Sequence, residues 1–191
     1  MRIISGEFRG RKLVDSSHLK DLRPTTDRNR EALFNILQSA KFLERLDFKI
    51  QDAKVLDLCC GTGAVAFEAM SRGAAQAFLI DKNPKHLEIA KKNAEVFKVE
   101  DKVTFLLADA EKLSIARQKF DLVFIDPPYS FKVDLMLKKI IENNWIDKKS
   151  LIVIESKYEQ KLDESLELLD SRSYGGSWFG FFVMKDGEGE S

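Results

Sequence analysis

The sequence predicts one α/β domain built on a mostly parallel, seven-stranded sheet that ends in an antiparallel hairpin. From Lys54 onward, short apolar runs alternate with amphipathic helical stretches, which is the pattern of a parallel sheet with crossover helices. Two strand-like runs close the chain on either side of Gly175 and Gly176, a pair that favours a tight hairpin. The length of 191 residues, 44% of them hydrophobic, allows one well-packed core and is too small for two catalytic domains.

The elements of this sheet follow from the periods of the apolar residues. Strands are expected at residues 55–58, 77–81, 103–107, 122–125, 151–154, 166–174 and 177–184. Helices are expected between them at residues 64–71, 84–97 and 133–143. Pro84 suits the first turn of its helix, where its missing amide hydrogen is not needed.

Residues 1–40 are expected to form a small extension of a core that occupies residues 41–185. Short strands of a β-hairpin are predicted around Gly6 and Gly10, and Thr26 is placed to cap a helix that begins near Asp27. This helix puts four apolar residues on one face, Leu33, Ile36, Leu37 and Ala40. Residues 186–191 are polar and glycine-rich, and they are expected to be disordered.

The formal net charge is zero overall but unevenly distributed. The first 30 residues contain eight basic and four acidic side chains, a net charge of +4, and the remaining 161 residues carry −4. A zero net charge argues against a protein that coats nucleic acid through bulk charge. The basic segment can bind phosphates. On charge alone, a solvated surface hairpin explains it equally well.

The composition disfavours several further classes of protein. No run of about 18 apolar residues occurs and the amino terminus has no secretory pattern, so a soluble, cytoplasmic protein is expected. Cys59 and Cys60 are adjacent and poorly placed for a disulfide or a zinc site, and we interpret them as reduced, small apolar residues. His18 and His86 lie in no metal-spacing motif and are expected on the surface. No metal site is predicted.

A glycine-rich turn follows the first strand of the core. Asp57 lies in that strand, and Gly61 and Gly63 lie between it and the next helix, at the edge where open α/β sheets bind ligands. The glycines remove side chains where the backbone must approach a ligand closely. Asp57 can interact with a cationic amino group or with its water shell.

Two more acids follow the next two strands. Asp81 ends the second strand, a position from which a carboxylate can accept hydrogen bonds from ribose hydroxyls, and Asp109 follows the third, where an adenine amino group would lie. Each acid taken singly could instead cap a helix. Gly61 and Gly63, with Asp81 20 residues after Gly61, also satisfy the loose fingerprint of a dinucleotide fold, which leaves a dehydrogenase open.

The fourth strand ends in an acid, two prolines and an aromatic residue, Asp126-Pro127-Pro128-Tyr129. An exocyclic amine on a nucleic-acid base is a poor nucleophile because its lone pair is delocalised into the ring. Asp126 and the carbonyl of Pro127 can accept the amine hydrogens and orient the nitrogen for in-line methyl transfer. The prolines limit loop flexibility, and Tyr129 offers a face on which an unstacked base can rest. Taken alone, this motif also fits a proline turn with an incidental aromatic residue.

These residues, together with segments near the amino terminus, resemble the bacterial RsmD-type 16S ribosomal RNA guanine-N2 methyltransferases. The amino-terminal segments are residues 1–6, 9–13, 23–28 and 30–35, and the resemblance spans nearly the whole chain. It implies the Rossmann-like class I methyltransferase fold, S-adenosyl-L-methionine as cofactor and a guanine in small-subunit ribosomal RNA as substrate. The implied partner is the small ribosomal subunit or an assembly intermediate, bound by a monomer that contacts no membrane.

The resemblance also implies roles for individual residues. The amine-methylating loop would be formed by Asp126, Pro127, Pro128 and Tyr129. The cofactor pocket would be formed by Asp57, Cys59, Gly61, Gly63, Asp81, Lys82, Asp109 and Ala110. RNA would be contacted by Arg9, Arg11, Lys12, Arg23 and Arg28. For Arg23 and Arg28, contact with the methionine carboxylate of the cofactor is an alternative.

Other activities remain open at this stage. Glu7 and Asp21 make the arm less basic, which favours a ribosomal particle over naked RNA as the substrate. An adenine or cytosine amino methyltransferase could use the same loop, although the 53 residues before Lys54 leave little room for a target-recognition region. Methylation of a glutamine side chain is disfavoured, because that loop resembles Asn-Pro-Pro-Tyr and this chain has Asp126. A non-catalytic RNA-binding assembly factor would share the fold.

Overall fold

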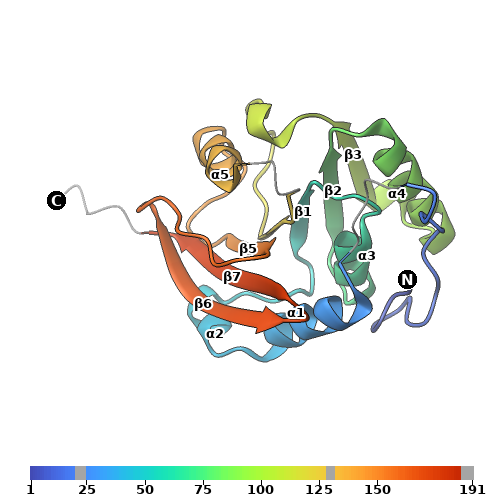
Figure 1. Ribbon diagram of the computed structural model, residues 1–191, viewed down its shortest axis with the longest axis horizontal. Helices are drawn as coiled ribbons and strands as arrows, with labels where there is room; N and C mark the ends of the chain where they lie inside the picture. Colours follow the sequence, from blue (N-terminus) through green and yellow to red (C-terminus); the bar gives the residue numbers. More distant parts are fainter. Residues whose placement is uncertain (20–24, 128–131, 186–191) are drawn as a thin grey trace.

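The structure is a computed structural model that describes residues 1–19, 25–127 and 132–185 (Figure 1). Its seven strands form one sheet in the order β3-β2-β1-β4-β5-β7-β6. The strands are β1 (Lys54–Leu58), β2 (Gln76–Asp81), β3 (Val103–Leu107), β4 (Leu122–Ile125), β5 (Leu151–Ser156), β6 (Leu166–Tyr174) and β7 (Ser177–Met184). The predicted seven-stranded sheet is therefore confirmed.

The direction of the strands determines where a ligand can bind. β1 to β5 are parallel to one another, whereas β7 runs antiparallel to both β5 and β6. The reversed β7 distinguishes this sheet from the all-parallel order of dinucleotide-binding folds. Because β1, β2, β4 and β5 are parallel neighbours, their carboxyl ends meet at a single edge of the sheet.

The described helices are α1 (Asp27–Ser39), α2 (Phe42–Leu46), α3 (Ala64–Ser71), α4 (Pro84–Phe97) and α5 (Val133–Glu142). The predicted cap of α1 is confirmed, since the Thr26 side chain accepts a hydrogen bond from the amide of Asn29. The five-residue α2 was not predicted, because so short a helix offers no periodicity to detect. Two 3₁₀ turns, η1 (Glu100–Lys102) and η2 (Ala110–Lys112), were also missed. None of the described helices is both long and apolar enough to cross a membrane.

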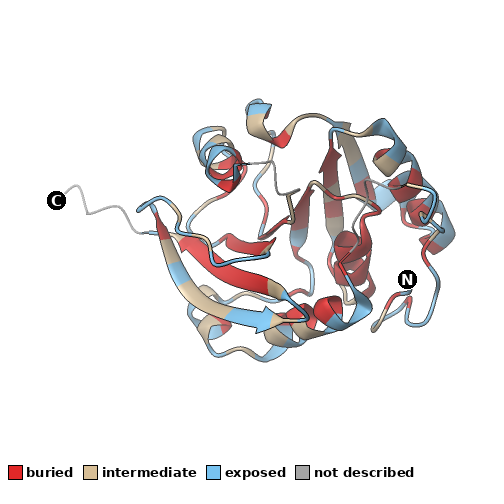
Figure 2. Cartoon of the chain, viewed as in Figure 1, coloured by how far each residue is buried: buried red, intermediate tan, exposed pale blue. Residues whose placement is uncertain are grey.

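Both faces of the sheet are covered, and the strand residues alternate between two cores. Val55 and Phe124 belong to the core shared with α1, α3 and α4, whereas Leu56 and Ile125 belong to the core shared with α5. Every residue of α3 is buried (Figure 2). α3 therefore lies inside the protein, between the sheet and the amino-terminal segment.

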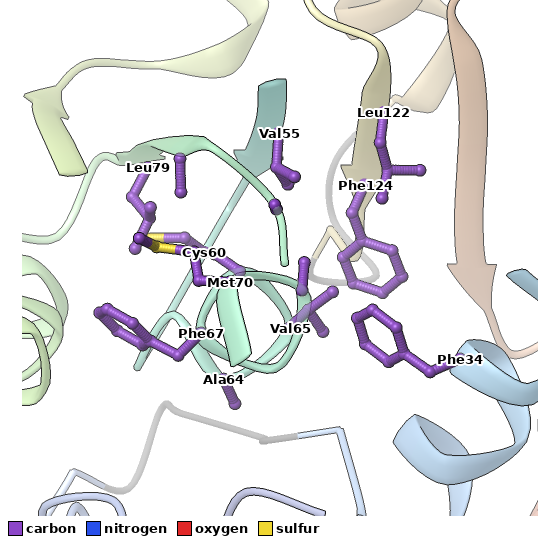
Figure 3. Packing of buried hydrophobic residues seen from close by; sticks show 14 of the residues in the cluster. Phe34, Val55, Cys60, Ala64, Val65, Phe67, Met70, Leu79, Leu122 and Phe124 are labelled. Carbon is purple, nitrogen blue, oxygen red and sulfur yellow. The ribbon is translucent and has the colours of Figure 1, made fainter. Parts of the chain in front are cut away.

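The helix of the amino-terminal extension packs into the first of these cores. Leu33, Phe34 and Leu37 of α1 are buried, and Figure 3 shows the rings of Phe34 and Phe124 pointing toward each other. Burying a large aromatic side chain typically stabilises a fold by about 1.5–3 kcal/mol. This packing fixes the start of α1 beside the end of β4.

No continuous strand forms around Gly6 and Gly10 in the first 19 residues, where an isolated antiparallel bridge joins Arg2 and Lys12 and three backbone hydrogen bonds connect residues 1–3 with residues 10–13. Both glycines adopt positive φ angles, 80° and 79°, which belong to turns and interrupt extended strands. The backbone amides between the two paired ends bond to α3: the amide of Glu7, for example, donates to the carbonyl of Ser71 at 2.7 Å. The predicted β-hairpin is therefore only partly formed, because α3 satisfies the backbone donors that longer strands would have paired.

Candidate functional site

A cavity of about 910 Å³ lies at the edge of the sheet where β1, β2, β4 and β5 end. Its volume suits a ligand the size of a nucleoside derivative. The predicted site residues among its lining are Asp57, Cys59, Gly61, Asp81, Lys82, Ala110, Asp126 and Pro127. Gly63 and Asp109 are not among the described residues that line it.

The turn after β1 is held by the acid that ends β2. The amide of Gly61 donates to Oδ2 of Asp81 at 2.9 Å, and Gly61 has a φ of 54°, in the left-handed region. Cys59 also adopts a positive φ of 59°, and burial raises the pKa of its thiol to about 12. Both cysteines are free, and Cys60 is buried, which agrees with the prediction of reduced, small apolar residues.

Gly63 has a different role from the one expected. It precedes α3 with a φ of 74°, and a Cβ there would lie 2.6 Å from Leu79 and 2.7 Å from Phe67. Its missing side chain is therefore required by packing inside the protein, whereas we had expected it to let a ligand approach the backbone.

Asp57 is a buried acid, only 2% exposed, that lines the cavity. Its pKa is raised to about 8, mainly by burial and also by the nearby charge of Asp81, although a backbone hydrogen bond from Ala66 lowers it. Its Oδ2 is buried and has no hydrogen-bond partner among the described residues. A buried carboxylate oxygen without a donor is a binding position for a cationic or hydrogen-bonding ligand group.

Asp81 makes three contacts that orient its carboxylate. Besides Gly61, the amide of Asn83 donates to its Oδ1 at 2.9 Å, and Nδ1 of His86 lies 3.2 Å from its Oδ2. The prediction that His86 is a surface residue was wrong, because its side chain is 12% exposed and lines the cavity. The first turn of α4 brings this ring back onto the end of β2, a contact that residue spacing alone did not indicate.

The residues after β2 and β3 complete the wall on that side. Lys82 and Ala110 both line the cavity, and Ala110 is buried. Asp109, the residue before Ala110, acts as a cap: its Oδ1 accepts from the amide of Glu111 at 3.0 Å, at the start of η2. Asp109 therefore fits the alternative role of a helix cap that the sequence allowed for each of these acids.

The wall at the carboxyl end of β4, the strand next to β1, contains Asp126 and Pro127. Both are partly exposed, so a ligand in the cavity can reach them. Oδ2 of Asp126 accepts a hydrogen bond from the hydroxyl of Thr25 at 3.4 Å. Pro128 and Tyr129 lie outside the described residues.

Sequence reasoning missed a buried polar cluster in the same wall, formed by Thr25, Asn29 and Glu155. The hydroxyl of Thr25 lies 3.0 Å from Oε2 of Glu155, and Nδ2 of Asn29 lies 3.3 Å from Oε1 of the same side chain. All three residues line the cavity. The rule that found Asp57, Asp81 and Asp126, an acid at the carboxyl end of a strand, would also have found Glu155.

The predicted RNA-contacting residues lie on the amino-terminal segment and α1. Arg9, Lys12 and Arg28 are exposed, and Arg23 lies outside the described residues. Arg11 is exposed but also packs, with its guanidinium 5.2 Å from the centre of the Phe97 ring. Arg11 therefore helps to attach the amino-terminal segment to α4.

Comparisons with known proteins agree with this geometry. Residues 1–183 match the model of a family described as Conserved hypothetical protein 95. The ribosomal RNA small subunit methyltransferase D of Escherichia coli strain K12 is 36% identical over 167 residues, covering 85% of this chain and 77% of the relative.

Two solved structures are similar over most of their length. The yhhF protein of Escherichia coli superposes with a TM-score of 0.80 at 28% identity, covering 97% of this chain and 98% of that one. An RNA methyltransferase from Salinibacter ruber, in complex with S-adenosyl-L-homocysteine, gives a TM-score of 0.64 at 18% identity, covering 88% and 98%. The latter likeness shows the fold alone, and the fold is that of class I methyltransferases.

Proposed function

Since the chain belongs to the Conserved hypothetical protein 95 family, we propose that it is an S-adenosylmethionine-dependent methyltransferase of small-subunit ribosomal RNA. Its target in this proposal is the exocyclic N2 amino group of a guanine in 16S ribosomal RNA. The observation that supports this most strongly is the position of Asp126 and Pro127 in the same cavity as the buried Asp57.

The residues of the cavity fit S-adenosyl-L-methionine. Oδ2 of Asp57 is a buried acceptor without a partner among the described residues, as the amino group of a methionine moiety requires. The contacts from Gly61, Asn83 and His86 hold the carboxylate of Asp81 for ribose hydroxyls, and Cys59, Lys82 and Ala110 complete this side. When bound, the cofactor supplies an electrophilic methyl group.

Asp126 and Pro127 perform the positioning that the chemistry requires. The carboxylate of Asp126 and the carbonyl of Pro127 accept the two hydrogens of the amine, which orients the lone pair and favours the pyramidal nitrogen. Asp126 is anchored by Thr25 at the start of α1, so the orienting acid does not depend on its own loop alone. Pro128 and Tyr129 belong to the same proposed loop.

The amino-terminal segment is proposed as the RNA-contacting arm. Arg9, Lys12 and Arg28 present exposed cations, and phosphates bound there would bring the target base to the cavity. Arg11 and Arg23 belong to this arm as well. The proposed substrate is the small ribosomal subunit or an assembly intermediate in the cytoplasm.

Transfer of labelled methyl from S-adenosylmethionine to small ribosomal subunits that lack this modification tests the proposal. Digestion and mass spectrometry of the nucleosides should identify N2-methylguanosine. Labelled adenine or cytosine would still support a methyltransferase of nucleic acid, but it would contradict guanine as the target base. Absence of transfer to any nucleic acid, in a preparation that binds the cofactor, would remove the proposed function.

A further inference from the structure

Glu155 is a buried acid on the cavity wall that the proposed methyl transfer does not yet use. Its side chain is 5% exposed and lies near the end of β5, the strand next to β4 and Asp126. β5 continues to this point because Glu155 pairs with Phe179 of β7. An acid is rarely buried at such a position unless hydrogen bonds stabilise it, and its contacts show which groups do so.

One hydroxyl joins the two acids. Oγ1 of Thr25 lies 3.0 Å from Oε2 of Glu155 and 3.4 Å from Oδ2 of Asp126. Thr25 is itself buried, at 9% exposure. The two carboxylates therefore lie within the reach of a single side chain, close enough to contact neighbouring atoms of one nucleic-acid base.

Asn29 makes this wall still richer in acceptors. Its amide nitrogen faces Oε1 of Glu155 at 3.3 Å and Oγ of Ser177 at 3.1 Å, which is the orientation that an acceptor-only carboxylate imposes. Its amide oxygen is buried and has no hydrogen-bond partner among the described residues. A carboxylate offers about four acceptor positions, and the contacts with Thr25 and Asn29 use one on each oxygen of Glu155.

The bases differ in the atom beside their exocyclic amine. In guanine the ring nitrogen N1 next to the N2 amine carries a hydrogen and donates. In adenine and cytosine the ring nitrogen next to the amine is a bare acceptor. A wall rich in acceptors can therefore bind the N1–H group of guanine. With adenine or cytosine, a lone pair of the wall would face the lone pair of the bare ring nitrogen, which is unfavourable.

We infer that Glu155 is the residue that selects guanine, by accepting the N1–H hydrogen bond while Asp126 accepts from the neighbouring amine. Thr25 and Asn29 hold the Glu155 carboxylate toward the cavity. This inference rests on the proposed function, and it assigns base selection to a residue of β5 that lies outside the Asp126 loop.

The test changes one base of the substrate and one side chain of the protein. After the methylated position has been mapped with wild-type protein, small subunits are reconstituted with guanosine or with 2-aminopurine ribonucleoside at that position. 2-Aminopurine keeps the amine, has a bare N1 and lacks the C6 carbonyl, so the Glu155 variant is needed to assign the preference to N1. Wild-type protein should prefer guanosine by about 10- to 100-fold in kcat/KM, the usual effect of one charged hydrogen bond.

Glu155→Gln should shrink this preference to within about threefold, because the new amide can donate to a bare N1. The variant can keep its neighbours, with its oxygen toward Asn29 and its nitrogen toward Thr25, whose hydroxyl can accept. Glu159→Gln removes the same charge from an exposed position four residues away and should keep the wild-type preference.

Each failure has a separate signature. Equal rates of wild-type protein on the two substrates would overturn the inference even if Glu155→Gln did not fold. Equal losses on both substrates in Glu155→Gln would also overturn it and leave Glu155 a purely structural role. If wild-type protein methylated neither substrate, the proposed function itself would fail.

Discussion

Glu68 and Arg72 form an ion pair inside the protein, with Oε1 of Glu68 2.9 Å from Nε of Arg72 and the two side chains 0% and 4% exposed. The same carboxylate accepts the amides of Ile4, at 2.8 Å, and Ser5, at 3.0 Å. Nε of Arg30 lies 3.8 Å from its other oxygen. Glu68 therefore attaches the amino-terminal segment and α1 to α3.

Glu68→Ala should lower the free energy of unfolding by about 3 kcal/mol or more, because it leaves Nε of Arg72 and the amides of Ile4 and Ser5 without their acceptor inside the protein. Urea unfolding measures this change. Hydrogen exchange should also accelerate at the amides of Ile4 and Ser5. Glu95→Ala, at an exposed position on α4, is the matched control and should change stability by less than about 0.5 kcal/mol.

Asp57 should make the ligand-free protein less stable as the pH rises. Its pKa is about 8 in the folded protein against an ordinary value of 3.8, so the folded state holds the proton more tightly. The destabilisation is absent below about pH 4 and grows between pH 4 and 8. The free energy of unfolding of Asp57→Asn, relative to that of wild type, should therefore increase by about 2–3 kcal/mol between pH 5 and pH 7.5.

Urea unfolding of both proteins at the two pH values measures this difference. Asp101→Asn, at an exposed site, should show no such trend. Asp57→Asn should also bind S-adenosylmethionine more weakly in calorimetry, since it loses the charge opposite the amino group. A variant whose stability advantage did not grow with pH would contradict the account of Asp57.

Substitutions in the proposed RNA-contacting arm should weaken RNA binding and leave cofactor binding unchanged. Arg9→Ala combined with Lys12→Ala should weaken binding to small subunits and reduce the slope of log affinity against log salt by about 1 to 2. Affinity for S-adenosylmethionine should stay at the wild-type value, because neither residue lines the cavity. An unchanged salt slope would return this segment to a solvated surface role.

Arg11→Ala should behave differently from these two. Its guanidinium stacks on Phe97 and donates to the carbonyl of Val96, so its removal should also lower stability by about 0.5–1 kcal/mol. Thermal unfolding of Arg11→Ala beside Arg9→Ala separates the two effects. Equal melting temperatures would show that the Phe97 contact contributes nothing measurable.

The strands and the long helices could be predicted because their signals are local. The apolar segments that form β1 to β4 end near the acids and turns that make the site. Asp57, Asp81 and Asp126 could be predicted as site residues from that pattern. β5 was predicted to end at Ile154, so the same rule would have included Glu155, which was overlooked. The true end of β5 is set by pairing with β7, which residue spacing within β5 does not reveal.

Other parts of the site depend on packing between distant segments. Thr25 and Asn29 reach the cavity because Phe34 packs α1 against the sheet, and His86 reaches Asp81 through the first turn of α4. The β-hairpin around Gly6 and Gly10 is only partly formed for the same reason, since the amides of Ile4, Ser5, Glu7 and Phe8 bond to α3. Contacts of this kind leave no periodic trace in the sequence.

The most direct test of the central claim compares wild-type protein with Asp126→Ala in methyl transfer to small ribosomal subunits, alongside calorimetry with S-adenosylmethionine. The account predicts that transfer falls by about 10³-fold or more, because the amine is no longer oriented, while cofactor affinity changes by less than about threefold. Transfer at the wild-type rate by Asp126→Ala would contradict it.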